Sequence, residues 1–86
     1  MNMIDLEGID CLELFGGTGS ISYELASRGA TAITFVEQDR GNINFVNKTI
    51  KELGIADSFT IVKWDVFKYL KSCTTQYDFI FADPPY

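Results

Sequence analysis

Short apolar runs alternate along this chain with segments of helical periodicity, and this alternation constrains the fold more than any other feature. The apolar runs are residues 10–15, 32–37, 59–64 and 77–82, each of a length typical of a buried strand. Strands that alternate with helices predict a parallel sheet with right-handed crossovers. We therefore expect an α/β, Rossmann-like fold with four parallel strands in the order 3-2-1-4 and flanking helices.

The segments between these runs predict three helices. Ser20 is the candidate cap of the first, which ends at Gly29 and carries Ile21, Leu25 and Ala26 on one face. Asp39 is the candidate cap of the second, which Gly54 closes. The apolar face of that helix is Ile43, Val46, Ile50 and Leu53, and its solvent face is Asn44, Asn47, Lys48 and Lys51. Asp65 begins a short third helix that runs to about Lys71.

The length and charge of the chain limit the classes of function. Its 86 residues suit one domain, 1–86, and its net charge of −5 lacks the general basic character of nucleic-acid-binding proteins. Cys11 and Cys73 form no CxxC pair and histidine is absent, so we expect no metal site. The N-terminus does not resemble a signal peptide and no apolar run could span a membrane, so we expect a cytoplasmic protein without membrane partners.

A glycine-rich turn follows the first expected strand, from Leu14 to Gly19. Glycines without a Cβ let backbone N–H groups approach a ligand closely, and the helix that follows adds unpaired donors. A plain glycine-rich turn is the alternative interpretation. A dinucleotide-binding pattern would require glycine at position 22, where this chain has Ser22, and no Lys-Ser/Thr pair of a P-loop follows.

Acidic residues stand at the ends of the second and third expected strands, where ligands bind in sheets of this type. Glu37 lies about twenty residues beyond the glycines, the usual position of a carboxylate that accepts from ribose hydroxyls. Asp65 could accept from an adenine amino group while the Val66 N–H donates to the ring. Solvent exposure for Glu37 and a simple helix cap for Asp65 are the alternatives. We expect Trp64 to lie in the core.

Asp83, Pro84, Pro85 and Tyr86 follow the fourth expected strand directly. Two prolines fix the backbone and remove donors, which leaves the Pro84 carbonyl free to point outward. Asp83 and that carbonyl could accept the two hydrogens of a base amino group while Tyr86 stacks on the base. The alternative is a proline-terminated strand with a surface tyrosine.

Together these motifs resemble the DPPY class of S-adenosylmethionine-dependent amino-methyltransferases. Within that class the chain is most similar to the RsmD-like family, which methylates guanine N2 of small-subunit (16S) ribosomal RNA. The resemblance runs from about Gly8 to the last residue and is carried by Glu13 to Gly19, Ser27 to Ala30, Phe35 to Glu37, Asp65, and Phe81 to Tyr86. Glycine at position 16 and glutamate at position 13 depart from the alanine and aspartate that are common in the family.

The resemblance implies a methyl transfer from S-adenosyl-L-methionine to the amino nitrogen of a base in ribosomal RNA or the small ribosomal subunit. Glu13 and the glycine turn would hold the methionine end, Glu37 the ribose, and Asp65 with Val66 the adenine. The implied cofactor-binding residues are Glu13, Phe15, Gly16, Gly17, Thr18, Gly19, Glu37, Gln38, Asp65 and Val66, and the implied catalytic residues are Asp83, Pro84, Pro85 and Tyr86.

Members of the family have further segments before the first strand and after the fourth motif. We therefore expect this chain to be the cofactor-binding half of a domain, able to bind cofactor but weak or inactive in catalysis, and able to form a homodimer through the exposed edge of its fourth strand. A DNA adenine-N6 methyltransferase and a non-catalytic binding or interaction module are the alternative functions.

Overall fold

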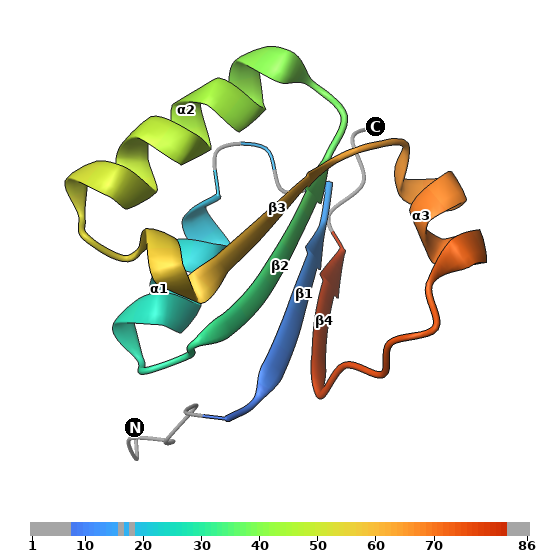
Figure 1. The fold of residues 1–86 in the computed structure, drawn as a ribbon, viewed down its shortest axis with the longest axis horizontal. Coiled ribbons are helices and arrows are strands. Elements are labelled where there is room, and N and C mark those ends of the chain that lie inside the picture. Colours follow the sequence, from blue (N-terminus) through green and yellow to red (C-terminus); the bar gives the residue numbers. More distant parts are fainter. Residues whose placement is uncertain (1–7, 16, 18, 83–86) are drawn as a thin grey trace.

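Four parallel strands form one sheet in the computed structural model, which describes residues 8–15, 17 and 19–82 (Figure 1). The spatial order is β3-β2-β1-β4, which confirms the predicted fold class and strand order. The strands are β1 (Asp10–Leu14), β2 (Ala32–Glu37), β3 (Phe59–Lys63) and β4 (Phe79–Ala82). The helices are α1 (Ser20–Ser27), α2 (Arg40–Glu52), the 3₁₀ turn η1 (Ala56–Ser58) and α3 (Val66–Ser72).

The strand register brings the carboxyl ends of all four strands to one edge of the sheet. Leu14 of β1 pairs with Val36 of β2 and with Ala82 of β4, and Glu37 pairs with Lys63 of β3. We call this edge the carboxyl edge. Glu37 is the last residue of β2, and the glycine turn and Asp65 come shortly after the ends of β1 and β3. The topology therefore gathers them on the same side of the molecule.

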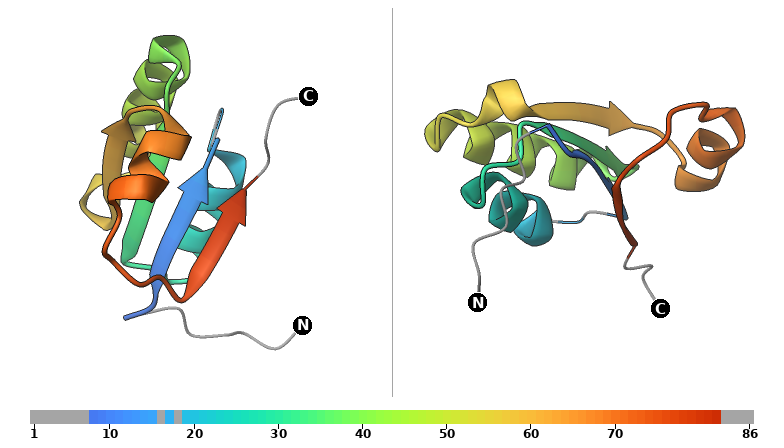
Figure 2. Two further views of the ribbon diagram at one scale, coloured as in Figure 1. Left: turned by 90° about the vertical axis from the view of Figure 1, so that its right-hand side faces the viewer. Right: turned by 90° about the horizontal axis from the view of Figure 1, so that it is seen from below.

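Helices cover both faces of the sheet, but unequally (Figure 2). Helices α1 and α2 pack on one face, where Phe35 contacts Ile43, Val46 and Ile50 of α2. Helix α3 packs on the other face, where Val66 joins a cluster with Leu12, Leu14 and Val36. The most central strands, β1 and β2, therefore carry the most completely buried side chains, among them Leu12, Ile33, Phe35 and Val36.

Helix α1 differs from the prediction at its first turn. Gly19, not Ser20, is the N-cap, with φ 83° and no side-chain cap, and Ser20 is the first helical residue. Ile21 is 42% exposed, whereas Ser22 is fully buried. The predicted face was wrong at Ile21 because α1 is rotated so that Ser22, rather than Ile21, faces β1.

Helix α2 follows the prediction closely. The Asp39 carboxylate accepts from the Asn42 N–H at 2.8 Å, and Ile43, Val46 and Ile50 are buried. Leu53 was predicted on the buried face but is 58% exposed, because it is the C-cap where the helix already leaves the sheet. Asn47 was predicted to face solvent, but it is half-buried in the structure.

Three strands are shorter than predicted. β1 ends at Leu14 because Phe15 adopts a left-handed conformation, φ 57°, which turns the chain out of the sheet. Trp64 lies beyond the end of β3 and is 43% exposed, so the prediction that it lies in the core was wrong. Tyr77 lies before the start of β4. The hydroxyl groups of Tyr77 and Tyr69 form a hydrogen bond of 2.6 Å.

The Tyr69–Tyr77 contact ties α3 to the connection that leads into β4. Burial, together with the hydrogen bond to Tyr77, raises the pKa of Tyr69 well above its ordinary value. The connection ends at Asp78, whose N–H donates to the Asp10 carbonyl at 2.8 Å and whose carboxylate accepts from the Asp10 N–H at 2.9 Å. This reciprocal pair sets the start of β4 beside the start of β1. None of the helices within the described residues is long and apolar enough to cross a membrane.

Candidate functional site

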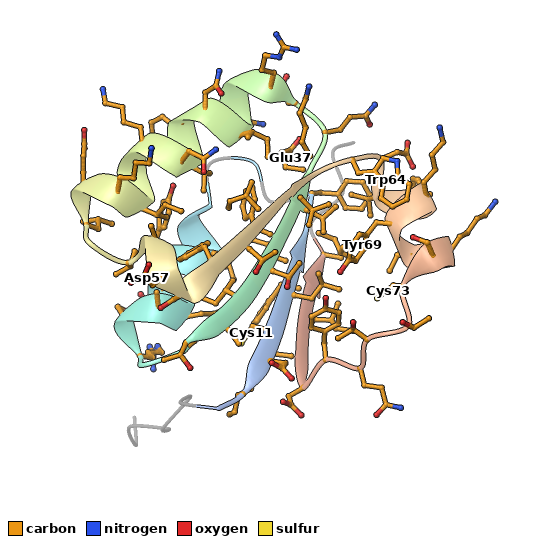
Figure 3. All side chains as sticks on the ribbon, viewed as in Figure 1. Cys11, Glu37, Asp57, Trp64, Tyr69 and Cys73 are labelled. Carbon is orange, nitrogen blue, oxygen red and sulfur yellow. The ribbon has the colours of Figure 1, made fainter. Side chains whose placement is uncertain are left out.

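Glu37 joins the end of β2 to the glycine turn. Its Oε1 accepts from the Gly17 N–H at 2.8 Å across twenty residues of sequence. Its Oε2 accepts from the N–H groups of Gln38 at 2.9 Å and Asp39 at 2.8 Å. These three bonds fix a half-buried carboxylate at the carboxyl edge, where Figure 3 labels it. The two motifs that sequence analysis placed in one site are thus in direct contact.

Glu13 lies inside β1 and its side chain is almost fully buried, with 5% of the residue exposed. Its Oε1 accepts from the Ser22 N–H at 3.1 Å and also from the Ser22 hydroxyl. Buried carboxylates need such donors, and the first turn of a helix adds a favourable dipole. Glu13 is therefore anchored against the first turn of α1, directly beside the glycine turn.

Gly19 packs against the side chain of Tyr23, one turn further along the chain. A Cβ built on Gly19 would lie 2.9 Å from the Tyr23 ring and 3.0 Å from its hydroxyl oxygen, and Gly19 has φ 83°. Only glycine fits both the space and the conformation. In the described part of the chain, the buried Tyr23 hydroxyl has no hydrogen-bond partner. Such an unsatisfied group beneath the turn is a feature expected near a ligand or functional site.

Asp65 is the N-cap of α3. Its Oδ1 accepts from the Lys68 N–H at 3.0 Å, which confirms the cap that sequence analysis kept as an alternative. The structure brings Asp65 next to Glu37 along the carboxyl edge, because the adjacent Trp64 N–H donates to the Glu37 carbonyl at 3.2 Å. Val66 is buried, 4% exposed, in the cluster beneath α3.

Phe15 connects the glycine turn to α3. Its ring meets that of Phe67 edge to face, with centroids 5.8 Å apart and planes at 65°. The left-handed backbone of Phe15 accounts for this direction, since an extended residue would have continued β1. Phe67 is 65% exposed, so this aromatic pair lies at the surface.

The structure thus gathers eight of the predicted cofactor-binding residues around the carboxyl edge: Glu13, Phe15, Gly17, Gly19, Glu37, Gln38, Asp65 and Val66. Gly16 and Thr18 lie outside the described residues, as do Asp83, Pro84, Pro85 and Tyr86. The last described residue, Ala82, pairs with Leu14, so β4 ends at the same edge.

Three residues that contact the predicted site residues were not predicted from the sequence. Ser22 holds Glu13, Tyr23 fills the space beneath Gly19, and Phe67 packs on Phe15. A signal was available for Ser22, because it occupies the position where a dinucleotide-binding pattern has glycine. Tyr23 and Phe67 gave no such signal, since an aromatic residue in a helix is most simply interpreted as core.

Comparison with known proteins places this geometry in context. A family described as Conserved hypothetical protein 95 matches residues 1–86. The chain is 33% identical over 76 residues to ribosomal RNA small subunit methyltransferase D of Buchnera aphidicola subsp. Baizongia pistaciae, covering 88% of this chain and 38% of that protein. It is 32% identical over 80 residues to ribosomal RNA large subunit methyltransferase K/L of Shewanella loihica, covering 92% and 11%. The chain thus spans less than half the length of these curated relatives.

Solved structures share the fold. A protein from Haemophilus influenzae superimposes with a TM-score of 0.87 at 30% identity, covering 98% of this chain and 54% of that one. A SAM-dependent methyltransferase from Agrobacterium tumefaciens superimposes with a TM-score of 0.81 at 26% identity, covering 92% and 26%. The observed sheet is therefore that of a Rossmann-like methyltransferase fold. Because the family match extends over the whole chain, the protein belongs to the Conserved hypothetical protein 95 family, in agreement with its resemblance to RsmD-like proteins.

Proposed function

We propose that this chain binds S-adenosyl-L-methionine at its carboxyl edge and serves methyl transfer to an exocyclic amino group in ribosomal RNA, with guanine N2 as the favoured target. The observation that carries the proposal is the hydrogen bond between Gly17 of the glycine turn and Glu37. It brings together a turn whose backbone can approach a ligand closely and a carboxylate whose position is fixed by hydrogen bonds. The names of the curated relatives support ribosomal RNA over DNA, and we accordingly propose a cytoplasmic location.

The donors around Glu37 indicate how it would hold a ribose. A carboxylate has about four lone-pair sites, and the N–H groups of Gly17, Gln38 and Asp39 use three of them. One ribose hydroxyl can donate to the site that remains. A second would take the place of the Gly17 N–H, which would then be free to donate to the cofactor. Nothing lies within 4 Å of a Cβ built on Gly17, so the described surroundings leave room there.

The remaining roles follow the family resemblance. Glu13, held by Ser22, would fix the methionine end, and Asp65 and Val66 would recognise the adenine. Asp83 and the Pro84 carbonyl would accept the two amino hydrogens of the base, Pro85 would keep the backbone rigid, and Tyr86 would stack on the base. The cofactor supplies an activated methyl group. The protein contributes orientation, and positioning of this kind can lower a barrier by roughly 7–11 kcal/mol.

Calorimetry with S-adenosylhomocysteine tests the cofactor part of the proposal. We expect the chain to bind it, and Glu37→Ala to weaken binding by about 10- to 100-fold, because hydrogen bonds to a charged group contribute about 1.5–3 kcal/mol. Glu24→Ala is the matched control, since Glu24 is an exposed acid of α1 that forms an ion pair with Arg28. Absence of binding by the unaltered chain would refute the proposal.

A second pair of variants separates the two roles of Asp65. Asp65→Ala and Asp39→Ala each remove the N-cap of a helix, so both should lose about 1 kcal/mol of stability. Only Asp65→Ala should also weaken S-adenosylhomocysteine binding, because only Asp65 is proposed to contact the adenine. Equal affinities for the two variants would leave Asp65 with the cap alone.

The transfer step is tested with radiolabelled S-adenosylmethionine and small-subunit ribosomal RNA, either naked or in the subunit. We expect N2-methylguanosine as the product, abolished by Asp83→Ala. Because this chain spans less than half the length of its curated relatives, we expect the isolated chain to be weak or inactive in transfer. N6-methyladenine formed in DNA instead would support the DNA methyltransferase alternative, and cofactor binding with no transfer to any substrate would support a binding module.

A further inference from the structure

A strip of lysines and apolar side chains extends from the end of β3 along the exposed side of α3. We define this α3 strip as Trp64, Phe67, Lys68, Leu70 and Lys71. Its three apolar members are unusually exposed, with Trp64 at 43%, Phe67 at 65% and Leu70 at 46%. Val66 and Tyr69, on the opposite side of α3, pack on the sheet. Phe67, Lys68 and Lys71 therefore lie on the side of α3 that does not pack on the sheet.

The charge of the strip is opposite to that of the chain. The chain has a net charge of −5 and only seven lysines and arginines, yet residues 63–71 hold three of those seven. Asp65 is the one acid in that stretch, and its carboxylate is occupied in capping α3. Three lysines and one aspartate give residues 63–71 a local charge of +2. An exposed apolar surface bordered by lysines favours an anionic partner with flat apolar groups.

The strip begins at the candidate site. Phe67 contacts Phe15 of the glycine turn region, and the Trp64 N–H donates to the carbonyl of Glu37. Phe67 and Lys71 are four residues apart, so they lie one above the other on the same side of α3. Figure 3 labels Trp64 at the start of α3, next to the carboxyl edge. A ligand on the strip would thus be continuous with a substrate at the carboxyl edge.

We propose that the α3 strip binds a single-stranded RNA segment next to the target nucleotide. Bases would stack on Trp64 and Phe67, and Lys68 and Lys71 would contact phosphates. Unpaired RNA offers both groups at once, since its bases can splay out onto aromatic rings while its backbone follows a positive surface. This inference rests on the proposed function for the class of substrate, but it assigns a surface outside the cofactor site.

Helix α2 supplies a matched control surface. It also carries three basic residues, Arg40, Lys48 and Lys51, and an exposed aromatic side chain, Phe45, at 52%. However, α2 covers the opposite face of the sheet. Helix α2 starts at the carboxyl edge with Arg40. Lys48 and Lys51 lie at least eight residues further along it, so they are about 12 Å or more from that edge along the helix axis. The α2 variants thus remove one exposed phenylalanine and two lysines, as the α3 variants do, but farther from the candidate site.

The test measures binding of a fluorescein-labelled twelve-nucleotide oligouridylate to the unaltered chain and its variants by fluorescence anisotropy at low salt. Phe67→Ala should weaken binding by about tenfold, because stacking on one aromatic ring contributes about 1–3 kcal/mol. The pair Lys68→Glu and Lys71→Glu should weaken it further and reduce the slope of log affinity against log salt by about 1.4. Phe45→Ala and the pair Lys48→Glu and Lys51→Glu should change affinity by less than about twofold. Circular dichroism confirms that each variant is folded.

Equal losses from the α2 and α3 variants would show general charge attraction and overturn the proposal. Lack of oligonucleotide binding by the folded, unaltered chain would also overturn it, as would a Phe67→Ala variant that binds like the unaltered chain. The Lys68→Glu and Lys71→Glu pair should bind S-adenosylhomocysteine normally. Cofactor binding without RNA binding therefore refutes only this inference, whereas RNA binding without cofactor binding refutes the proposed function.

Discussion

Gly19 stands where α1 begins and where the backbone passes closest to the side chain of Tyr23. We predict that Gly19→Ala destabilises the chain by about 2–5 kcal/mol. The left-handed conformation costs about 1–2 kcal/mol for a residue with a Cβ, and the contact with the Tyr23 ring adds an overpacking cost of about 1–3 kcal/mol. Urea denaturation measures the loss.

Gly54→Ala is the control for that prediction. Gly54 also has a positive φ, 71°, but nothing lies within 4 Å of a Cβ built on it. Its substitution should therefore cost only the conformational part. Equal losses at Gly19 and Gly54 would mean that the space beneath Gly19 imposes no constraint.

Ser22 donates to the buried carboxylate of Glu13 through both its backbone N–H and its hydroxyl. We predict that Ser22→Ala destabilises the chain by about 1–3 kcal/mol, because a hydroxyl donor to a buried carboxylate is lost. Ser27→Ala is the control, since Ser27 is exposed and its hydroxyl donates to the Glu24 carbonyl rather than to a buried carboxylate. Chemical denaturation of the two variants should separate them, and a neutral Ser22→Ala would contradict the anchoring role.

We predict that the buried thiol of Cys11 makes the folded chain less stable at alkaline pH. Burial first, and then the charges of Asp78 and Asp10, raise the pKa of the Cys11 thiol above its ordinary value of 9.0. Above about pH 9 the unfolded chain therefore releases a proton that the folded chain retains, so stability should fall as pH rises. In Cys11→Ala the denaturation midpoint should fall less steeply between pH 8.5 and 10. An unchanged slope would contradict this assignment.

At the scale of the elements, α2 depends on a cap that the sequence already indicates. The Asp39 carboxylate accepts from the Asn42 N–H, and the backbone at Asp39 is extended, as an N-cap requires. We predict that Asp39→Ala destabilises the chain by about 1 kcal/mol and that Asp39→Ser restores most of the loss, since serine also caps helices well. Urea midpoints test both. Failure of serine to rescue would indicate that the charge, rather than the cap, matters.

At the scale of the whole molecule, β4 is the outermost strand on one side of the sheet that the described residues form. Phe79 is 40% and Ile80 58% exposed, and the ring of Phe79 stacks on Phe81 at 5.8 Å. An apolar edge strand with free backbone groups favours pairing with another strand. We predict a homodimer through β4 that forms with increasing concentration and that Ile80→Lys weakens. Multi-angle light scattering measures the mass, and a monomer at high concentration would contradict the prediction.

The sequence by itself determined the order of the strands and brought the glycine turn and Glu37 to the same edge of the sheet. Short apolar runs, glycine turns and Asp39 act locally, and right-handed crossovers then leave few arrangements. The Gly17–Glu37 contact follows, because the carboxyl ends of neighbouring parallel strands meet at one edge. The roles of Asp83 to Tyr86 remain predictions, since these residues lie outside the described part of the chain.

Only the tertiary structure decided which sides of the helices are buried and how far. Ser22 rather than Ile21 faces β1. Trp64 and Phe67 are exposed, although large apolar side chains are usually expected in the core. These outcomes depend on the rotation of each helix about its axis and on which neighbours cover it. Periodicity specifies that a helix has two sides, but the distance and angle at which it packs on the sheet select the residues that meet there.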